Sequence, residues 1–159
     1  MKTEFYQTLN RQAQALLEGE DDLIAAMANF SALLNDSLED LNWAGFYIKR
    51  GEQLVLGPFQ GKVACTRINM GKGVCGTAAA ENKTQRVADV HQFDGHIACD
   101  SASNSEIVIP VRQGNEVVAV LDIDSPLLNR FDQDDQIGLE NMVKSFETCL
   151  FGQIANKLD

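Results

Sequence analysis

The hydrophobic positions in the first quarter of the chain recur with a helical period. Residues 4–17 form an amphipathic helical pattern that stops before Gly19. Within residues 21–38, apolar side chains recur at i, i+4, i+7 and i+11, which places them on one face of a helix. These residues are Leu23, Met27, Phe30 and Leu34. We therefore expect two helices, the second of which faces a core.

The middle of the chain changes to an extended pattern. Residues 41–48 are rich in aromatic and β-forming side chains, residues 50–52 are a turn signal, and residues 54–59 resume the extended pattern. This arrangement predicts a hairpin. A glycine-punctuated segment, a short helix and a strand are then expected at residues 71–76, 77–81 and 85–90, respectively.

The last third predicts a second hairpin and a terminal helix. Two β-branched runs at residues 107–111 and 116–123 are joined by a turn, which places this hairpin at the centre of the sheet. Asp132 is an N-cap candidate for the helix that follows. Its buried stripe comprises Leu139, Met142, Phe146 and Leu150. The order of elements predicts an α+β fold: a mostly antiparallel sheet, with N- and C-terminal helices on one face and a small inserted helix.

Composition and charge narrow the class of protein. The chain has 159 residues, 45% of them hydrophobic and 23% charged, as in soluble globular proteins. Without repeats or linkers, it is expected to form one domain over residues 1–159. Its net charge of −10 argues against nucleic acid and anionic membranes as partners. No apolar run approaches the length of about 20 residues that a membrane span needs, and the N-terminus lacks a secretory signal, so we expect a cytoplasmic protein.

The four cysteines provide the first candidate chemistry. They contain no C-x-x-C pair, and in a reducing compartment they are expected to be free, catalytic, redox-active or metal-binding. Cys149 shares the apolar stripe of the terminal helix and is interpreted as a small buried hydrophobe. Cys65, Cys75 and Cys99 lie in or beside loops or turns, and Cys75 comes at a helix start, where a thiolate is favoured. A redox function follows if these three thiols meet in space.

Zinc binding is a competing use of the polar segment at residues 91–106, which contains both histidines and one cysteine. His91, His96 and Cys99, with one of the other loop thiols, could supply four ligands. Their spacing matches none of the usual structural zinc patterns, so no metal is expected. Both histidines could instead be hydrogen-bonded loop residues, or His96 could orient the loop or lower the pKa of Cys99.

Strand parity brings two further groups of side chains together. Asp122 and Asp124 lie on one face of an otherwise apolar strand. A buried carboxylate pair is unfavourable unless a cation neutralises it; alternatively, the strand has emerged into solvent at this point. Trp43 and Tyr47 share a face of the first strand, with Gly45 leaving a gap between them. They could form core packing or the wall of a small apolar pocket.

Five stretches across nearly the whole chain are together highly specific. They are NWAGFY at 42–47, LGPFQGKVAC at 56–65, GKGVCGTA at 71–78, DVHQFDGHIACDSASNSEIV at 89–108 and VLDIDS at 120–125. These stretches resemble the free methionine-(R)-sulfoxide reductases, enzymes built on a GAF domain. A generic GAF regulatory domain would share the strand order without the three thiols. The resemblance therefore implies a single GAF domain that acts as an oxidoreductase without a cofactor.

The resemblance also implies roles for the three loop thiols. Cys99 is similar to the nucleophile of the family, Cys65 to the main resolving cysteine and Cys75 to a further redox-active partner. The Cys99 thiolate would attack the sulfoxide sulfur, leaving a sulfenic acid that condenses with Cys65 to a disulfide. An external dithiol, by resemblance thioredoxin, would then reduce the disulfide.

The substrate side of the resemblance involves acidic and aromatic residues. Glu106, Asp122 and Asp124 resemble the groups that engage the ammonium and the sulfoxide of the substrate. Trp43 and Tyr47 resemble the aromatic contacts around its side chain. Buried carboxylates favour the free α-ammonium of an amino acid over the neutral amide of a peptide.

Two alternatives from other functional classes remain open. A GAF domain could bind an amino acid as a sensor without catalysis, or the chain could be a zinc-stabilised interaction domain. The absence of an output module within these 159 residues and the three loop cysteines argue against the sensor. The N-terminal helices could form a homodimer, as the resemblance suggests, and a monomer is the alternative.

Overall fold

The computed structural model describes residues 1–95 and 102–158. They form four α-helices, a short 3-10 helix and six strands. The helices are α1 (Lys2–Leu17), α2 (Leu23–Ser37), α3 (Gly73–Glu81), η1 (Val90–Gln92) and α4 (Gln133–Leu158). The strands are β1 (Trp43–Arg50), β2 (Gln53–Gly61), β3 (Arg67–Asn69), β4 (Gln85–Val87), β5 (Ser105–Gln113) and β6 (Glu116–Ser125). None of the described helices has the length and apolar character needed to cross a membrane.

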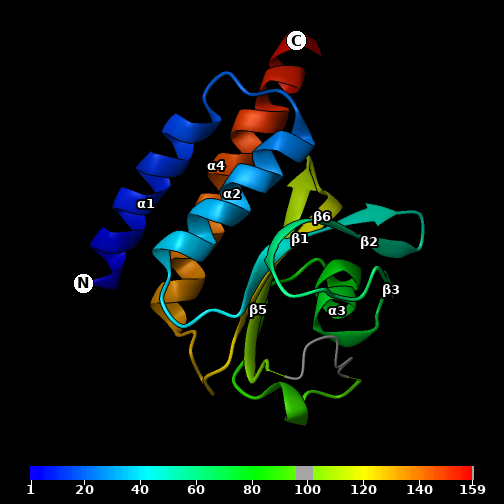
Figure 1. Ribbon diagram of the computed structural model, residues 1–159. Coiled ribbons are helices and arrows are strands. Elements are labelled where there is room, and N and C mark those ends of the chain that lie inside the picture. The colour runs from blue at the N-terminus through cyan, green and yellow to red at the C-terminus, as the bar shows by residue number, and fades with distance from the viewer. Residues whose placement is uncertain (96–101, 159) are drawn as a thin grey trace.

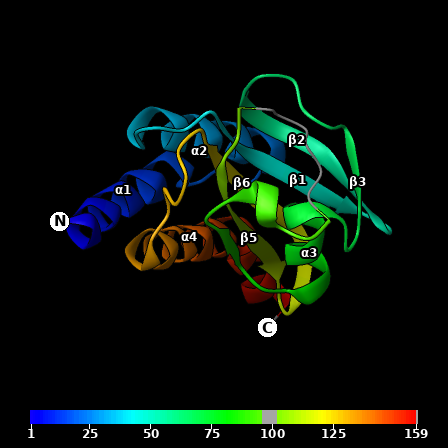
Figure 2. The same ribbon diagram turned by 90° about the horizontal axis from the view of Figure 1, so that it is seen from below.

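The strands form one antiparallel sheet in the order β3-β2-β1-β6-β5-β4. The two expected hairpins, β1–β2 and β5–β6, meet through the β1–β6 pair at the centre of the sheet. Helices α2 and α4 cover one face, with α1 packed against them on the same side of the sheet, whereas α3 lies against the other face (Figure 1, Figure 2). The predicted α+β arrangement is confirmed. The small inserted helix, α3, lies on the opposite side of the sheet from the three longer helices.

The larger core lies between the sheet and the three long helices. The predicted stripes of α2 and α4 are buried there, apart from Leu23, which is partly buried. Phe146 of α4 lies 5.3 Å, centroid to centroid, from both Phe30 of α2 and Phe46 of β1. Cys149 is half-buried at the edge of this core, so it is more exposed than the sequence predicts.

Alternation along the central strands separates the two faces of the sheet. Leu121 and Ile123 of β6 belong to the helix-side core, whereas Val120 of the same strand belongs to the cluster on the α3 side. A smaller cluster on the α3 side contains Trp43, Tyr47 and Cys75. The sequence pattern therefore places the candidate chemistry on the face opposite the main core.

Three local features differ from the sequence prediction. Helix α3 begins at Gly73 rather than at residue 77, and Gly73 has a φ of +63°, a conformation that glycine adopts without strain. The strand expected over residues 85–90 ends at Val87. Asp89 then accepts a hydrogen bond from the backbone N–H of His91, which starts η1. Strand β3 is too short to give a detectable period.

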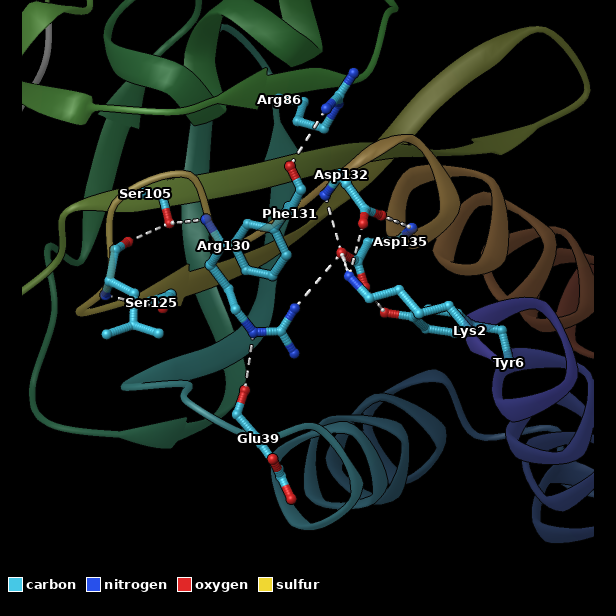
Figure 3. Close-up of polar contacts among 11 residues, drawn as sticks. Lys2, Tyr6, Glu39, Arg86, Ser105, Ser125, Arg130, Phe131, Asp132 and Asp135 are labelled. Atoms are coloured by element: carbon cyan, nitrogen blue, oxygen red, sulfur yellow. Dashed lines mark hydrogen bonds and ion pairs between the residues drawn. The ribbon is translucent and has the colours of Figure 1, made fainter.

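The start of α4 is fixed by a reciprocal hydrogen-bonded pair. Asp132 Oδ1 accepts from the Asp135 N–H at 3.0 Å, and Asp135 Oδ2 accepts from the Asp132 N–H at 2.9 Å. The predicted N-cap is thus completed by the residue three positions later. Buried Asp135 also accepts from Tyr6 Oη at 2.7 Å and from Lys2 Nζ at 2.8 Å, and it pairs with Arg130 (Figure 3). This carboxylate joins α1 to α4.

Substitution of Asp135 by Ala is expected to lower the free energy of unfolding by about 3–5 kcal/mol, because it leaves buried donors and a cation without their acceptor. Asp134→Ala is the matched control, since Asp134 lies in the same turn but is exposed. Urea unfolding monitored by circular dichroism measures both variants. Equal, small losses in the two variants would contradict the role assigned to Asp135.

Candidate active site

Strand register assembles an acidic cluster of Glu106, Asp122 and Asp124. Glu106 of β5 is paired with Asp124 of β6, and β1 places Gly45 opposite Asp122. The three side chains therefore share the face that α3 covers. They are buried, with residue exposures of 8%, 5% and 8%. The alternative in which the strand has emerged into solvent at Asp122 and Asp124 is wrong.

Cys75 of α3 lies against this acidic cluster. Its thiol donates a hydrogen bond to Glu106 Oε2 at an Sγ–Oε2 distance of 4.0 Å. Cys75 Sγ and one carboxylate oxygen each from Glu106 and Asp122 lie within 4.8 Å of one another. Among the described residues, these three form the group that could hold a metal ion. Helix α3 thus places a buried thiol next to two carboxyl groups of the sheet.

Burial and mutual repulsion control protonation in the cluster. The pKa of Glu106 is well above its ordinary value of 4.5, first because of burial and then because of Asp122 and Asp124. Burial, with the charges of Asp122 and Glu106 next, also raises the pKa of Cys75 well above 9.0. A helix start alone would favour the thiolate of Cys75. Burial and the neighbouring carboxyl groups outweigh the effect of the helix start and keep Cys75 as a thiol. The thiolate expected from the sequence is therefore wrong.

Two carboxyl groups of the acidic cluster, those of Glu106 and Asp122, lack a basic partner among the described residues. Within residues 1–95 and 102–158, neither Glu106 nor Asp122 forms an ion pair with a lysine or arginine. In the same part of the chain, Asp122 Oδ1 is buried and has no hydrogen-bond partner. Buried carboxylates gain from a proton or from an external cation. The geometry is therefore suited to a small ligand that carries a positive charge.

An aromatic stack of Tyr47, Trp43 and Phe59 lies beside the cluster. Trp43 is stacked between the other two rings, at centroid distances of 5.9 Å to Tyr47 and 5.1 Å to Phe59. Trp43 and Tyr47 are each 2% exposed and belong to the α3-side core. Gly45 leaves no gap, because a Cβ there would collide with Phe59. Strand β2 fills the space that the sequence left open.

The loop after β2 carries Cys65, which is half-buried and disulfide-bonded. Trp43 Nε1 donates to the carbonyl of Lys62 at 3.1 Å, and Tyr47 Oη donates to the carbonyl of Cys65 at 2.8 Å. Burial, followed by the charge of Asp122, raises the pKa of Tyr47. The expected nucleophile Cys99 and the expected loop residue His96 lie outside the described residues.

Asn104 is a structural residue that sequence reasoning missed. Its amide Oδ1 lies 3.0 Å from His91 Nε2, and its Nδ2 donates to the carbonyl of Pro126 at 2.7 Å. Its backbone N–H donates to Ser125, and its carbonyl accepts from Val90. The hydrogen-bonded interpretation of His91 is confirmed. An asparagine in a polar segment has no periodic signal that would identify this role.

A cleft of about 730 Å³ lies away from the acidic cluster, between the end of α3, β5 and α4. Its polar groups bind one another: Arg112 contacts Asn82, and Glu147 Oε2 accepts from the Arg112 backbone N–H at 2.6 Å. Thr84 similarly donates to Glu140. Polar side chains that line this cleft are thus paired with one another, and its lining, among the described residues, contains neither a thiol nor the buried carboxyl groups of the acidic cluster.

A six-stranded antiparallel sheet with three long helices on one face and α3 over an acidic cluster on the other is the architecture of a GAF domain. The GAF domain family matches residues 27–148. The chain is 57% identical to free methionine-R-sulfoxide reductase of Escherichia coli (strain K12) over 149 residues, which covers 94% of this chain and 90% of that protein. It belongs to the free methionine-R-sulfoxide reductase family of GAF-domain proteins.

Solved structures agree with this assignment. The free methionine-R-sulfoxide reductase from Neisseria meningitidis, in complex with its substrate, superimposes with a TM-score of 0.90 at 40% identity, covering 94% of this chain and 90% of that one. A protein described as a GAF sensor, from Burkholderia vietnamiensis, reaches a TM-score of 0.92 at 54% identity, with 96% and 97% covered. The fold is shared along nearly the full length of both structures.

Substitution of Glu106 by Gln is expected to raise the melting temperature at pH 7 by about 3 °C or more. The folded chain keeps the Glu106 proton, whereas the unfolded chain releases it above the ordinary pKa of 4.5. Stability is therefore lost as pH rises above 4.5, and Gln removes that loss. The gain should vanish below pH 4.5.

The groups that face Glu106 in the described structure are Asp122 and Asp124 of β6, Cys75 of α3 and Tyr47 of β1. Glu116→Gln, an exposed substitution on the same hairpin, is the control. Thermal melts over a pH series measure both variants. A Glu106→Gln gain that persists unchanged at low pH would contradict the assigned protonation.

Proposed function

We propose that the protein reduces free L-methionine-(R)-sulfoxide to L-methionine. The observation that carries this proposal is the buried acidic cluster, which lies under the thiol of Cys75 and beside the aromatic stack. Carboxylates suit an ammonium group, aromatic rings suit a thioether side chain, and thiols suit reduction of a sulfoxide. The Escherichia coli and Neisseria relatives with this named activity support the assignment.

The acidic cluster selects a free amino acid in this proposal. Asp122 and Asp124 bind the α-ammonium, and Glu106 is directed at the sulfoxide oxygen. Trp43 and Tyr47 contact the side chain. Methionine within a polypeptide offers a neutral amide in place of the ammonium, and its chain continuations do not fit a site enclosed by α3.

The first chemical step transfers oxygen from substrate to protein. The Cys99 thiolate attacks the sulfoxide sulfur while Glu106, protonated because of its raised pKa, gives a proton to the oxygen. The oxygen passes to the Cys99 sulfur as a sulfenic acid, and the sulfoxide leaves as the thioether methionine. Two electrons move from the thiol to the substrate, so no cofactor is required.

The second step resolves the sulfenic acid. The thiol of Cys65 attacks the Cys99 sulfur, a disulfide forms and the hydroxyl leaves as water. The disulfide state of Cys65 in the structure supports this role. An external dithiol then reduces the bond, and we propose cytoplasmic thioredoxin for that step. Cys75 is a further redox partner in the same site.

The turnover experiment offers the reduced protein free L-methionine-(R)-sulfoxide, the free S epimer and a peptide-bound sulfoxide, each with excess dithiothreitol. We expect methionine from the free R epimer alone, measured by chromatography. A sensor domain would instead bind methionine sulfoxide without turnover, and a zinc-stabilised domain would contain metal after purification. Failure to reduce any of the three compounds would eliminate the proposed activity.

Cys99→Ser is expected to abolish methionine release, by at least about 1,000-fold, even in a single turnover without reductant, because no thiolate receives the oxygen. Cys149→Ser is the matched control, since Cys149 is half-buried at the edge of the helix-side core and away from the acidic cluster. Rapid-quench assays with one equivalent of substrate measure both. Full release by Cys99→Ser would show that the nucleophile is misassigned.

A further inference from the structure

We propose that Tyr47 is a positioning residue for disulfide formation, in addition to lining the substrate site. Its hydroxyl binds the backbone of Cys65 itself, with an Oη to carbonyl oxygen distance of 2.8 Å. Trp43 provides a second anchor three residues earlier, at Lys62. This role rests on the proposed function, because Cys65 acts there as the resolving thiol.

The segment that carries Cys65 needs such anchors. It connects the end of β2 at Gly61 to the start of β3 at Arg67, and β3 pairs with β2 only at residues 53–55. Lys62 and Val63 are exposed, with Val63 at 88%, so side-chain burial contributes little at the start of this connection. The carbonyl of Thr66 accepts from the Leu56 N–H of β2 at 3.0 Å at the end of the connection, and the two hydrogen bonds from β1 tie Lys62 and Cys65 to the centre of the sheet.

The two donors are themselves held rigidly. Tyr47 and Trp43 are stacked on each other and almost fully buried, and Trp43 is also stacked on Phe59. Gly61 has a φ of +138°, and a Cβ there would lie 2.6 Å from Trp43 Cδ1. The chain therefore leaves β2 directly against the indole ring. Anchors on a central strand fix the connection more closely than contacts within a loop could.

Fixing Cys65 bears on the second chemical step. In that step the Cys65 sulfur attacks the Cys99 sulfenic acid, the S–S bond forms and water leaves. The rate of such an intramolecular attack depends strongly on how often the two sulfur atoms are correctly oriented. A hydrogen bond to the carbonyl of Cys65 restricts the backbone that carries the attacking sulfur. The Tyr47 hydroxyl thus assists resolution, while its ring contributes to the substrate site.

Tyr47→Phe tests this role because it keeps the ring and removes only the hydroxyl. Tyr6→Phe is the matched control, since Tyr6 is the other tyrosine of the chain, is also buried and donates a bond of 2.7 Å to Asp135. One equivalent of sulfoxide is added without reductant. Chromatography follows methionine release, and dimedone trapping with thiol counting follows the sulfenic acid and the disulfide.

In Tyr47→Phe, the ratio of the disulfide-formation rate to the methionine-release rate should fall roughly tenfold, as expected for the loss of one hydrogen bond, with trapped sulfenic acid accumulating. The ratio should be unchanged in Tyr6→Phe. Equal changes in both rates, or no change in either, would overturn the role of Tyr47. No methionine release from the unsubstituted chain would overturn the proposed function and this role together.

Amide hydrogen exchange provides a measurement that does not depend on activity. Peptides that cover residues 62–66 should exchange faster in Tyr47→Phe than in the unsubstituted chain, both with the disulfide formed and after its reduction. The same peptides should be unaffected by Tyr6→Phe. Unchanged exchange in Tyr47→Phe would show that the hydroxyl does not anchor the connection, and the proposal would then be wrong even if resolution slows.

Discussion

The burial of three carboxyl groups on one face of the central sheet is the constraint on which the rest of the structure depends. Glu106, Asp122 and Asp124 oppose folding unless a proton or a cation compensates them. The fold accommodates them by building its main core on the opposite face, from the stripes of α2 and α4. Alternate residues of the same strand therefore serve different purposes. In β6, Leu121 and Ile123 belong to the main core, whereas Asp122 and Asp124 belong to the acidic cluster on the opposite face.

This separation was predictable from the sequence where a period carries it. The helical stripes and the shared face of Asp122 and Asp124 follow directly from spacing, and the structure confirms them. Burial of the two aspartates did not follow, because it depends on α3 and β5, which come from other parts of the chain. The protonation of Cys75 was mispredicted for the same reason: the helix start is a local property, whereas the carboxyl groups beneath it are brought there by tertiary structure.

Residues without a pattern were beyond sequence reasoning. Asn104 joins the segment around His91 to the end of β6 through backbone and amide groups, and β3 is too short to show alternation. Gly45 was interpreted as a gap, although the neighbouring strand approaches so closely that Phe59 occupies the space. Each of these features depends on the partner that a residue meets, which one sequence does not encode in its spacing.

The different environments of Cys65 and Cys75 bear on the order of the proposed redox steps. Cys75 is buried among acids that oppose its thiolate, so it is a poor attacking group while the cluster carries negative charge. Cys65 is half-buried in a connection outside the acidic cluster, where its sulfur is disulfide-bonded and its backbone carbonyl accepts a hydrogen bond from Tyr47. Because thiol exchange needs a thiolate, this contrast favours Cys65 as the first resolving group. Cys75 would become reactive only after a cationic substrate or a proton offsets the acidic cluster.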